Sequence, residues 1–401
     1  MLTNRQLFLL HLGQTSSSPL MVDIEKAEGV FMYGPNGEKY LDLISGVSVS
    51  NTGHRHPKVV EAVKKQVDSY LHLMVYGEMI QSPQVRYAKR LSELLPPNLS
   101  VCYFVNSGSE AVEGALKLAK KYTGKSRIIY FRNSYHGSTH GALSIQGSNI
   151  YKNAFRPLLP DTVQIDFNNF VSLDSIDNRT ACVIIEPVQA EAGVIYPTNG
   201  FLEEIRSRCS RTGALLIFDE VQTGFGRTGH MFAIDRFGVV PDILVLAKAL
   251  GGGMPLGAFI SSREIMSTLI TNPQLGHITT FGGHPVCCAA GLASLEVIIE
   301  ENLSVSCNGK SILFRKELRH PLIAEIRGEG LLLAVRIKKP EFVRYIVSHA
   351  PEHELILDYF LFCDDAFRIA PPLIINNDEI LQACNHIKLL LDDTMKNASN
   401  E

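Results

Sequence analysis

"DILVLAKALGGGMPLGA", residues 242–258, is a run of aliphatic residues that ends at a lysine and continues into glycine. Residues 242–247 are apolar at nearly every position, as in a strand covered on both faces. Lysine is almost never fully buried unless a partner pairs with it or it takes part in chemistry. Taken alone, Lys248 is better explained as a strand end that reaches water, followed by a flexible loop over residues 251–253. The stretch therefore predicts a buried strand and leaves the role of Lys248 open.

Five further runs of the same kind occur along the chain, and helical patterns separate them. The runs are "VCYFV" from Val101, "RIIYF" from Arg127, "ACVIIE" from Ala181, "ALLIFD" from Ala214 and "GAFIS" from Gly257. Helices are expected over Lys58–Leu71, Ser109–Tyr122, Gly200–Arg211 and Pro285–Glu300. Buried strands that alternate with helices predict an α/β fold with a mostly parallel, doubly wound sheet.

The two ends of the chain follow a different pattern. Residues 29–43 are typical of a hairpin with a turn at Pro35–Gly37. Beyond about residue 300, two strands around a turn at Gly328–Gly330 precede a helix from Glu341 and a final helix from Asp378. We therefore expect residues 51–300 to form a large domain. Residues 1–50 and 301–401 are expected to build a smaller α+β domain together.

Composition limits the classes of function. The 401 residues carry a formal charge of −3, which gives no electrostatic reason to expect nucleic acid or an acidic membrane surface as a partner. No run of about eighteen apolar residues predicts a membrane helix. Eight cysteines are scattered without a Cys-x-x-Cys pair, so we expect free thiols in a reducing cytoplasm and neither disulfides nor a metal site.

Unusual residues follow the predicted strands. Ser107-Gly108-Ser109 comes after the first run and Tyr135-His136-Gly137 after the second, while Glu186, Asp219 and Lys248 end the next three. Ligands of parallel α/β sheets bind at the carboxyl ends of the strands. Each residue alone has a structural explanation, such as a helix cap or a core position. Together they would line one edge with carboxylates, an amine, an aromatic ring and an anion site.

The segment "NSGSEAVEGALKLAKKY" is suited to bind phosphate. Ser109 can cap the helix and Gly108 lets the backbone approach a ligand. Exposed N–H groups and the helix dipole favour an anion there. The glycine spacing matches neither a Walker A loop nor a dinucleotide motif. A lysine, a carboxylate, an aromatic ring and a phosphate site are the groups that pyridoxal phosphate requires.

At this point the sequence resembles the class III, pyridoxal-phosphate-dependent aminotransferases of fold type I, over nearly the whole chain. This group includes acetylornithine, ornithine, 4-aminobutyrate and amine–pyruvate aminotransferases. The matching motifs are "YLDLISGVSVSNTGHRHPKVVEAV", "VNSGSEAVEGALKLAKKYTG", "YHGSTHGALS", "IIEPVQAEAGV", "LLIFDEVQTGFGRTG", "DILVLAKALGGGMPLGA", "TTFGGHPVCCAAG" and "FRIAPPLII". The resemblance implies a transaminase with a ping-pong Schiff-base mechanism in amino-acid metabolism.

The resemblance also implies roles around the cofactor ring. Lys248 would form the Schiff base and move the proton once substrate displaces it, and Asp219 would keep the pyridine nitrogen protonated. Gln222 would bond the phenolic oxygen, and Tyr135 would stack on the ring. His136 is expected to be a structural hydrogen-bonding residue.

Further cofactor contacts follow from the same motifs. Ser107, Gly108 and Ser109 would hold the phosphate, and Glu186 is counted among the cofactor-binding residues. Thr280 would reach the phosphate of the neighbouring subunit, so a cytoplasmic homodimer with shared sites is the smallest expected assembly, with a tetramer left open. His284 stands where the family usually has asparagine.

The substrates implied are an amino donor, with a terminal or ω-amino group, and a 2-oxo acid. Glu191 and Arg368 occupy positions at which ornithine-type relatives switch an arginine between a glutamate and a substrate carboxylate; a fixed ion pair is the alternative. Ser138 replaces the arginine of the usual His-Gly-Arg-Thr, which argues against N-acetylornithine or glutamate as preferred substrates. Tyr76 is a further candidate for the substrate pocket.

Other functions of the same fold remain open. Aminomutation and decarboxylation use the same cofactor chemistry, and a non-catalytic protein that binds pyridoxal phosphate or a partner is an alternative from another class. The amino donor and the choice between pyruvate and 2-oxoglutarate are not decided by the sequence.

Overall fold

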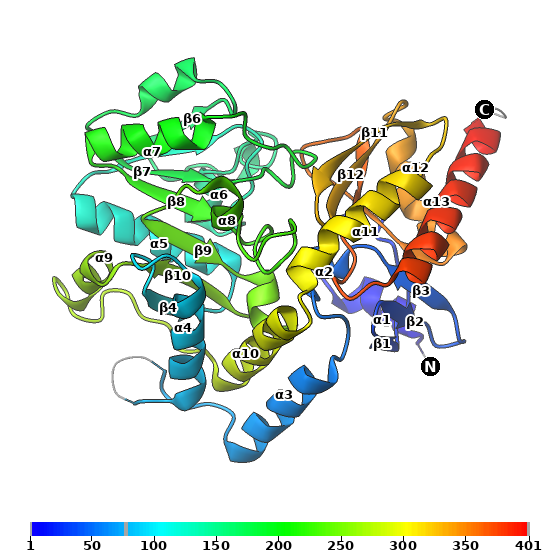
Figure 1. The fold of residues 1–401 in the computed structure, drawn as a ribbon, viewed down its shortest axis with the longest axis horizontal. Helices are drawn as coiled ribbons and strands as arrows, with labels where there is room; N and C mark the ends of the chain where they lie inside the picture. Colours follow the sequence, from blue (N-terminus) through cyan, green and yellow to red (C-terminus); the bar gives the residue numbers. More distant parts are fainter. Residues whose placement is uncertain (1, 76–78, 399–401) are drawn as a thin grey trace.

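The computed structural model describes residues 2–75 and 79–398 of the chain. Its largest sheet has seven strands in the order β4-β10-β9-β8-β7-β5-β6 (Figure 1). Every neighbouring pair is parallel except the two that involve β10, so the predicted mostly parallel sheet is confirmed. The strands are β4 Val101–Val105, β5 Arg127–Phe131, β6 Thr162–Ile165, β7 Thr180–Ile185, β8 Leu215–Asp219, β9 Ile243–Leu246 and β10 Gly257–Ser261.

Helices cover both faces of this sheet. Leu215 and Ile217 of β8 belong to an apolar cluster with α5 (Gly108–Thr123) on one face. Leu216 and Phe218 belong to another cluster with α7 (Phe201–Thr212) on the other face. Figure 1 shows α5 and α7 on opposite sides of the strands. Because alternate side chains of a strand point to opposite faces, both sets must be apolar, which explains the continuous apolar runs.

Two smaller sheets are built largely from the ends of the chain. One has the order β1-β2-β3-β13 and the other β11-β12-β15-β14. Their strands are β1 Lys26–Glu28, β2 Phe31–Tyr33, β3 Lys39–Asp42, β11 Ile323–Glu329, β12 Leu332–Ile337, β13 Leu355–Ile356, β14 Asp358–Tyr359 and β15 Ala366–Ile369. β13 pairs with β3, and both termini lie on the same side of the molecule in Figure 1. The division of the chain at residues 50 and 300 stays a prediction.

The remaining α-helices are α1 Asn4–His11, α2 Ser45–Ser48, α3 Pro57–Ser69, α4 Ser82–Leu94, α6 His140–Ser144, α8 Ala233–Phe237, α9 Arg263–Ser267, α10 Pro285–Glu300, α11 Leu303–Glu317, α12 Phe342–His349 and α13 Asn377–Ala398. They include four of the expected ones, α3, α10, α12 and α13, whose ends differ from the predicted ends by no more than a few residues. The sequence reading did not include β6, α4 or α11. β6, with the sequence TVQI, alternates polar and apolar residues and therefore lacks a continuous apolar run.

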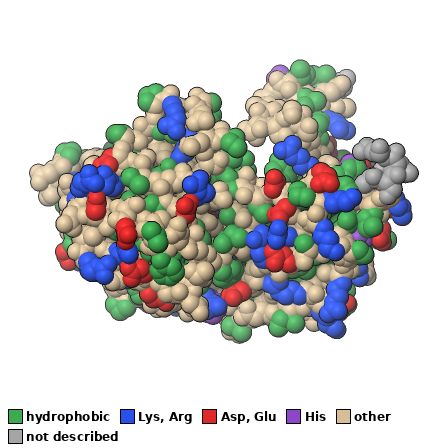
Figure 2. Space-filling model, turned by 90° about the horizontal axis from the view of Figure 1, so that it is seen from above, with side chains coloured by type: hydrophobic (Ala, Val, Ile, Leu, Met, Phe, Trp, Pro, Cys, Tyr) green, Lys and Arg blue, Asp and Glu red, His purple; other side chains and the backbone are tan. Residues whose placement is uncertain are grey.

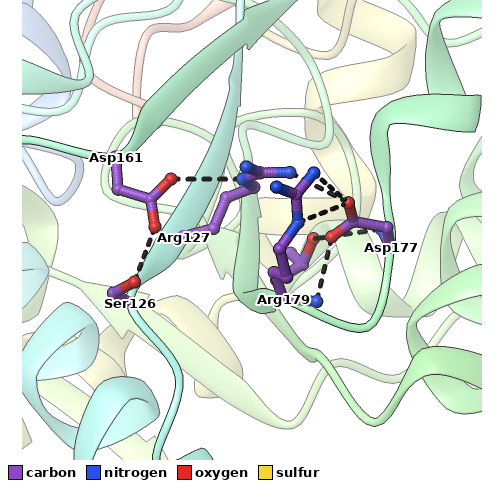
Figure 3. A network of polar contacts seen from close by, with 6 residues as sticks. Ser126, Arg127, Asp161, Asp177 and Arg179 are labelled. Carbon is purple, nitrogen blue, oxygen red and sulfur yellow. Dashed lines mark hydrogen bonds and ion pairs between the residues drawn. The ribbon is translucent and has the colours of Figure 1, made fainter.

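Ion pairs tie the strands together at the amino end of β5 and β7 (Figure 3). Arg127 at the start of β5 lies 3.2 Å from Asp161 and 2.9 Å from Asp177. Ser126 donates to Asp161 at 2.6 Å, and Arg179 pairs with Asp177 at 2.9 Å. The opposite charges pair with one another at the amino edge of the sheet. The candidate site residues predicted from the sequence lie at its carboxyl edge.

The surface in Figure 2 carries lysine and arginine side chains interspersed with aspartate and glutamate. This face therefore has no extended block of one sign, in keeping with the formal charge of −3. Among the helices of residues 2–75 and 79–398, none combines the length and the apolar composition that crossing a membrane requires.

Candidate active site

A cavity of about 510 Å³ lies at the carboxyl edge of the seven-stranded sheet. Glu186 directly follows β7, Asp219 is the last residue of β8, and Lys248 comes two residues after β9. Because β7, β8 and β9 are parallel neighbours, their carboxyl ends meet at one edge and all three side chains line the cavity. The fold thus brings together residues that are 62 positions apart at the extremes, from 186 to 248.

Lys248 occupies a constrained turn in the cavity wall. It opens a short 3-10 helix, η3 (Lys248–Gly251), with φ of +52°, a left-handed conformation that is uncommon for a residue with a side chain. Such a conformation costs about 1–3 kcal/mol and persists only where the surroundings fix it. Burial lowers the pKa of the Lys248 amine, and the positive charge of Arg368 acts in the same direction, while nearby carboxylates oppose it. The amine is therefore easier to deprotonate than an exposed lysine.

Asp219 is held by one partner on each of its oxygens. Nδ1 of His136 lies 2.7 Å from its Oδ2, and the backbone N–H of Val221 donates to Oδ1 at 3.0 Å. The His136 side chain is buried, and its Nε2 has no hydrogen-bond partner among the residues that the structure describes. His136 therefore orients the carboxylate, in keeping with the structural role expected for it.

Glu186 supports the loop that carries Tyr135. Its Oε1 accepts a hydrogen bond from the backbone N–H of Tyr135 at 2.8 Å, and its Oε2 accepts one from Ala190 at 3.2 Å. Burial raises the pKa of Glu186 well above its ordinary value, and the negative charge of Asp219 adds to the effect. Glu186 therefore loses its proton less readily than an exposed glutamate, and its two hydrogen bonds position the loop.

The amino terminus of α5 forms another part of the cavity wall. Ser107, and not Ser109 as expected, is the N-cap: its Oγ accepts a hydrogen bond from the backbone N–H of Glu110 at 3.2 Å. The helix begins one residue earlier than the sequence pattern indicated, which leaves the Ser109 Oγ free to accept from Ser138 N–H at 3.2 Å. A β-carbon at Gly108 would meet the side chain of Val221 at 3.2 Å, and the approach of a ligand to this backbone stays a prediction. The positive end of α5 thus faces the cavity.

Arg368 and Glu191 form a buried ion pair beside the cavity. Nη2 of Arg368 donates to Oε1 of Glu191 at 2.7 Å, and the same oxygen accepts from Nε2 of Gln222 at 3.1 Å. Arg368 is 1% exposed. Oε1 of Gln222 is buried without a hydrogen-bond partner in the described part of the chain, so an acceptor remains for a bound molecule.

Tyr135 and Ser138 face each other at the rim, where the two hydroxyl groups are 3.2 Å apart. Tyr135 lines the cavity, and Ser138 is exposed. Thr280 is exposed and is not among the described residues that line the cavity, and its role in a neighbouring subunit stays a prediction. Tyr76 lies outside the described residues.

Val221 was missed by the sequence reading. It lines the cavity between Asp219 and Gln222 and presents an apolar surface there. The sequence held a signal for Val221, because it lies between Asp219 and Gln222 in the motif from which those two residues were predicted.

Comparison with known proteins gives one consistent family. The model of the family described as "Aminotransferase class-III" matches residues 12–391. An acetylornithine aminotransferase of Methanopyrus kandleri is 39% identical over 378 residues, which is 93% of this chain and 94% of the relative. An acetylornithine aminotransferase of Methanocaldococcus jannaschii is 39% identical over 375 residues, which is 90% of this chain and 91% of the relative.

Solved structures of similar fold include an ornithine aminotransferase from Toxoplasma gondii, with a TM-score of 0.90 and 29% identity over 99% of this chain and 97% of that one. An (S)-enantioselective omega-transaminase from Thermomicrobium roseum has a TM-score of 0.88 and 29% identity over 97% of both chains. A transaminase from Virgibacillus has a TM-score of 0.92 and 26% identity over 98% of this chain and 99% of that one.

Proposed function

Because the chain belongs to the class III aminotransferase family, whose members use pyridoxal phosphate, we propose that its cavity transfers a terminal amino group to a 2-oxo acid. The protein is a transaminase of fold type I. The observation that carries the proposal is the placement of Lys248 and Asp219 at adjacent strand ends, beside the amino terminus of α5.

The residues present fit this cofactor. The Oε1 of Gln222 is buried and lacks a partner within the described residues, so it can accept from a bound group. Ser107, Gly108 and Ser109 at the start of α5 offer backbone N–H groups and hydroxyls to a phosphate, and Tyr135 offers a ring face. Asp219 offers a carboxylate whose position His136 fixes at 2.7 Å.

Pyridoxal phosphate, when bound, supplies an aldehyde that takes up the amino group and a ring that withdraws electrons from the carbon that loses its proton. Lys248 would supply the amine for this aldehyde, and the lowered pKa of its Nζ would allow it to accept and return a proton. Asp219 would keep a proton at the ring nitrogen by its charge. Glu186 keeps the Tyr135 loop in place over the cavity.

Arg368 and Glu191 can explain how one cavity accepts two chemically different substrates, an amine and a 2-oxo acid. In the resting geometry Glu191 occupies Nη2 of Arg368, so a substrate without a carboxylate at this position meets a neutral pair. A 2-oxo acid brings a carboxylate that can replace Glu191 on the guanidinium, which binds carboxylates well through its planar fork. Glu191 lies on the connection between β7 and α7, and its displacement would also break the hydrogen bonds that it accepts from Gln222 and from the backbone N–H of Leu361.

Ser138 narrows the class of amino donor. Three carboxylates, Glu186, Glu191 and Asp219, line the cavity, whereas Lys248 is the one lysine or arginine among its lining residues in the described part of the chain. A serine cannot replace a bidentate guanidinium, whose hydrogen bonds to a charged group contribute about 1.5–3 kcal/mol each. The favoured donor is therefore an amine that presents no carboxylate to Ser138.

N-acetylornithine is the second candidate donor. The curated relatives at 39% identity are named acetylornithine aminotransferases, and this supports a donor with a distal carboxylate. For such a donor, a positive group from another subunit or His140 at the rim would have to take the place of the missing arginine.

A panel of donors and acceptors tests the proposal. The aldehyde form of the holoenzyme is mixed with putrescine, ornithine, 4-aminobutyrate, glutamate or N-acetylornithine, and absorbance follows its conversion to the amine form. Putrescine should react at least about tenfold faster than N-acetylornithine, in line with one lost charged contact. Pyruvate or 2-oxoglutarate should then regenerate the aldehyde form.

Ser138→Arg is the matched variant for this panel. It should raise the rate with N-acetylornithine and leave the rate with putrescine within a few-fold of the parent. Fast reaction of the parent with N-acetylornithine would favour the second candidate. Carbon dioxide or a rearranged amino acid as product would identify a decarboxylase or an aminomutase, and no conversion by any donor would identify a non-catalytic protein.

The position of the reactive amine has its own test. Borohydride reduction of the holoenzyme followed by peptide mapping should place the cofactor label at Lys248. A label on another lysine would refute the assignment.

A homodimer is supported by exposed apolar side chains on two neighbouring segments. Met74 and Ile80 lie on the connection of α3 to α4, whereas Ile278 and Phe281 lie next to Thr280; they are 51%, 94%, 62% and 53% exposed. Ring contact of His72 with Phe281, with centroids 4.8 Å apart, places the two segments side by side. Apolar patches of this kind mark protein interfaces.

All eight cysteines are free thiols, which supports a cytoplasmic location.

A further inference from the structure

Arg368 faces two carboxylates, and the proposed exchange with substrate uses only one of them. Glu191 bonds its Nη2 at 2.7 Å, while Oδ2 of Asp358 lies 3.7 Å from its Nη1. Asp358 is on β14 and Arg368 on β15, and the two are direct partners in the antiparallel register. Residues directly opposite each other in such a ladder have neighbouring side chains on one face, so the second pairing is built into the sheet.

The two carboxylates differ in how firmly they are held. Asp358 belongs to a strand, and its Oδ1 accepts a hydrogen bond from the backbone N–H of Tyr359 at 2.8 Å. The guanidinium carbon of Arg368 also lies 4.7 Å from the ring centroid of Phe360, which follows β14. Glu191 is held by side-chain hydrogen bonds, in which its Oε1 accepts from Gln222 at 3.1 Å and its Oε2 from the backbone N–H of Leu361 at 3.2 Å. A substrate carboxylate that displaces Glu191 would break these bonds, whereas the position of Asp358 opposite Arg368 is set by the strand register.

The hydrogen-bonding groups that a substrate carboxylate needs lie next to Asp358. Nε and Nη1 of Arg368 are buried and have no hydrogen-bond partner within residues 2–75 and 79–398. A carboxylate that displaces Glu191 and binds in the usual two-point manner takes Nη2 and one of these groups. The bound substrate carboxylate would then share the guanidinium of Arg368 with Asp358, so that two negative groups lie beside one positive group.

Electrostatics therefore oppose carboxylate binding at this arginine. The Asp358 side chain is 32% exposed, so water screens its charge only in part. Burial raises the pKa of Asp358, and the positive charge of Arg368 opposes this shift.

We propose that Asp358 is a specificity-determining residue that weakens the binding of a substrate carboxylate to Arg368. The inference rests on the proposed function, because it concerns the 2-oxo acid of that reaction. Since Glu191 keeps its place on Arg368 when an amine without a carboxylate binds, Asp358 affects the acid half-reaction and leaves the amine half-reaction unchanged. The residue thus sets the balance between the two substrates of one cavity.

Asp358→Asn tests the proposal, because the amide keeps the shape of the side chain and removes its charge. Calorimetry measures the Kd of glutarate, an unreactive dicarboxylate, on the holoenzyme. Rapid mixing of the amine form with 2-oxoglutarate gives the concentration dependence of the second half-reaction. We expect both constants to fall by about three- to tenfold, the size for a partly screened charge. The rate with putrescine should stay within twofold.

Asp364→Asn is the control, since Asp364 is exposed on the same connection between β14 and β15 and none of the ion pairs of Arg368 involves it. It should leave both constants unchanged. Unchanged or weaker binding in Asp358→Asn, with Asp358→Ser as the second variant, would overturn the proposal. Glutarate binding does not require turnover, so a parent that fails to transaminate would refute the proposed function and still leave the role of Asp358 measurable.

Discussion

Asp219 illustrates how a single charge is prepared for chemistry in this fold. It is 5% exposed, and a ring nitrogen of His136 and a backbone N–H fix its two oxygens. A buried carboxylate held in this way needs no rearrangement to meet a cation at the cavity, and removing one partner of a buried ion pair typically costs about 3–5 kcal/mol.

Asp219→Asn should abolish most transamination, because the amide carries no charge to hold the proton on the ring nitrogen. We expect a fall of at least about a hundredfold in kcat, which corresponds to about 2.7 kcal/mol of lost transition-state stabilisation. Single-turnover absorbance changes measure the fall, and cofactor content shows that the variant still binds pyridoxal phosphate. The exposed Asp174→Asn is the control. Turnover of Asp219→Asn near the parent rate would contradict the assignment.

Lys152 is a second lysine with a buried amine, besides Lys248, and it is not among the residues that line the cavity. It is 3% exposed, and its Nζ donates to the hydroxyl of Tyr130 at 2.8 Å. Burial lowers the pKa of Lys152 from 10.5 to about 8, and the charge of Arg156 contributes to the shift. The folded protein thus releases this proton at a lower pH than the unfolded chain.

Lys152→Met should change how stability depends on pH. From about pH 8 to 10.5 the unfolded parent binds one proton more than the folded parent, so its free energy of unfolding rises with pH in this window. Relative to the variant, the parent should gain up to about 3 kcal/mol, measured by urea unfolding at several pH values. Lys65→Met is the control for loss of a surface charge. A pH-independent difference would contradict the prediction.

At the scale of elements, α10 fixes the turn that carries Lys248. Gly291 of α10 lies against η3, where a β-carbon would meet the carbonyl oxygen of Leu250 and the ring of Tyr87, the latter at 2.6 Å. The Tyr87 hydroxyl donates to that same carbonyl at 2.7 Å, so α4, α10 and η3 meet at one point. The left-handed Lys248 is therefore held by packing from outside the sheet.

Gly291→Ala should force α10 away from η3. Overpacking of this kind costs about 1–3 kcal/mol, and the displaced Lys248 should lower the rate of both half-reactions. Thermal unfolding and single-turnover rates measure the two effects. Gly309→Ala on α11 is the control, because a β-carbon there meets nothing within 4 Å and should stabilise the helix by up to about 1 kcal/mol. A neutral Gly291→Ala would contradict the packing argument.

At the scale of the whole molecule, we expect a second copy of the chain to cover two exposed apolar segments. They are the α3–α4 connection and the segment around Thr280. Sedimentation equilibrium should give at least twice the chain's 44.3 kDa. Ile80→Glu together with Phe281→Glu should shift this mass toward that of one chain, because a charge buried in an interface is strongly unfavourable. Ile312→Glu on α11, a position that is 67% exposed, is the control. A parent that sediments as a single chain would refute the homodimer.

Much of the fold could be predicted from local patterns. The strands 101–105, 127–131 and 257–261 begin and end as the aliphatic runs do, because a strand buried on both faces must be apolar throughout. Motifs also marked Glu186, Asp219 and Lys248. β6 alternates polar and apolar residues over four positions and offered no such signal.

The sequence by itself determined the class of the sheet and the identity of the residues at its carboxyl edge. Only the tertiary structure decided that Ser107 caps α5, that His136 holds Asp219, and that Asp358 lies beside Arg368. The physical reason is the range of the interactions: strand and helix patterns depend on neighbours along the chain, whereas side-chain contacts at a strand end depend on the order and register of the strands, which segments far apart in sequence set together.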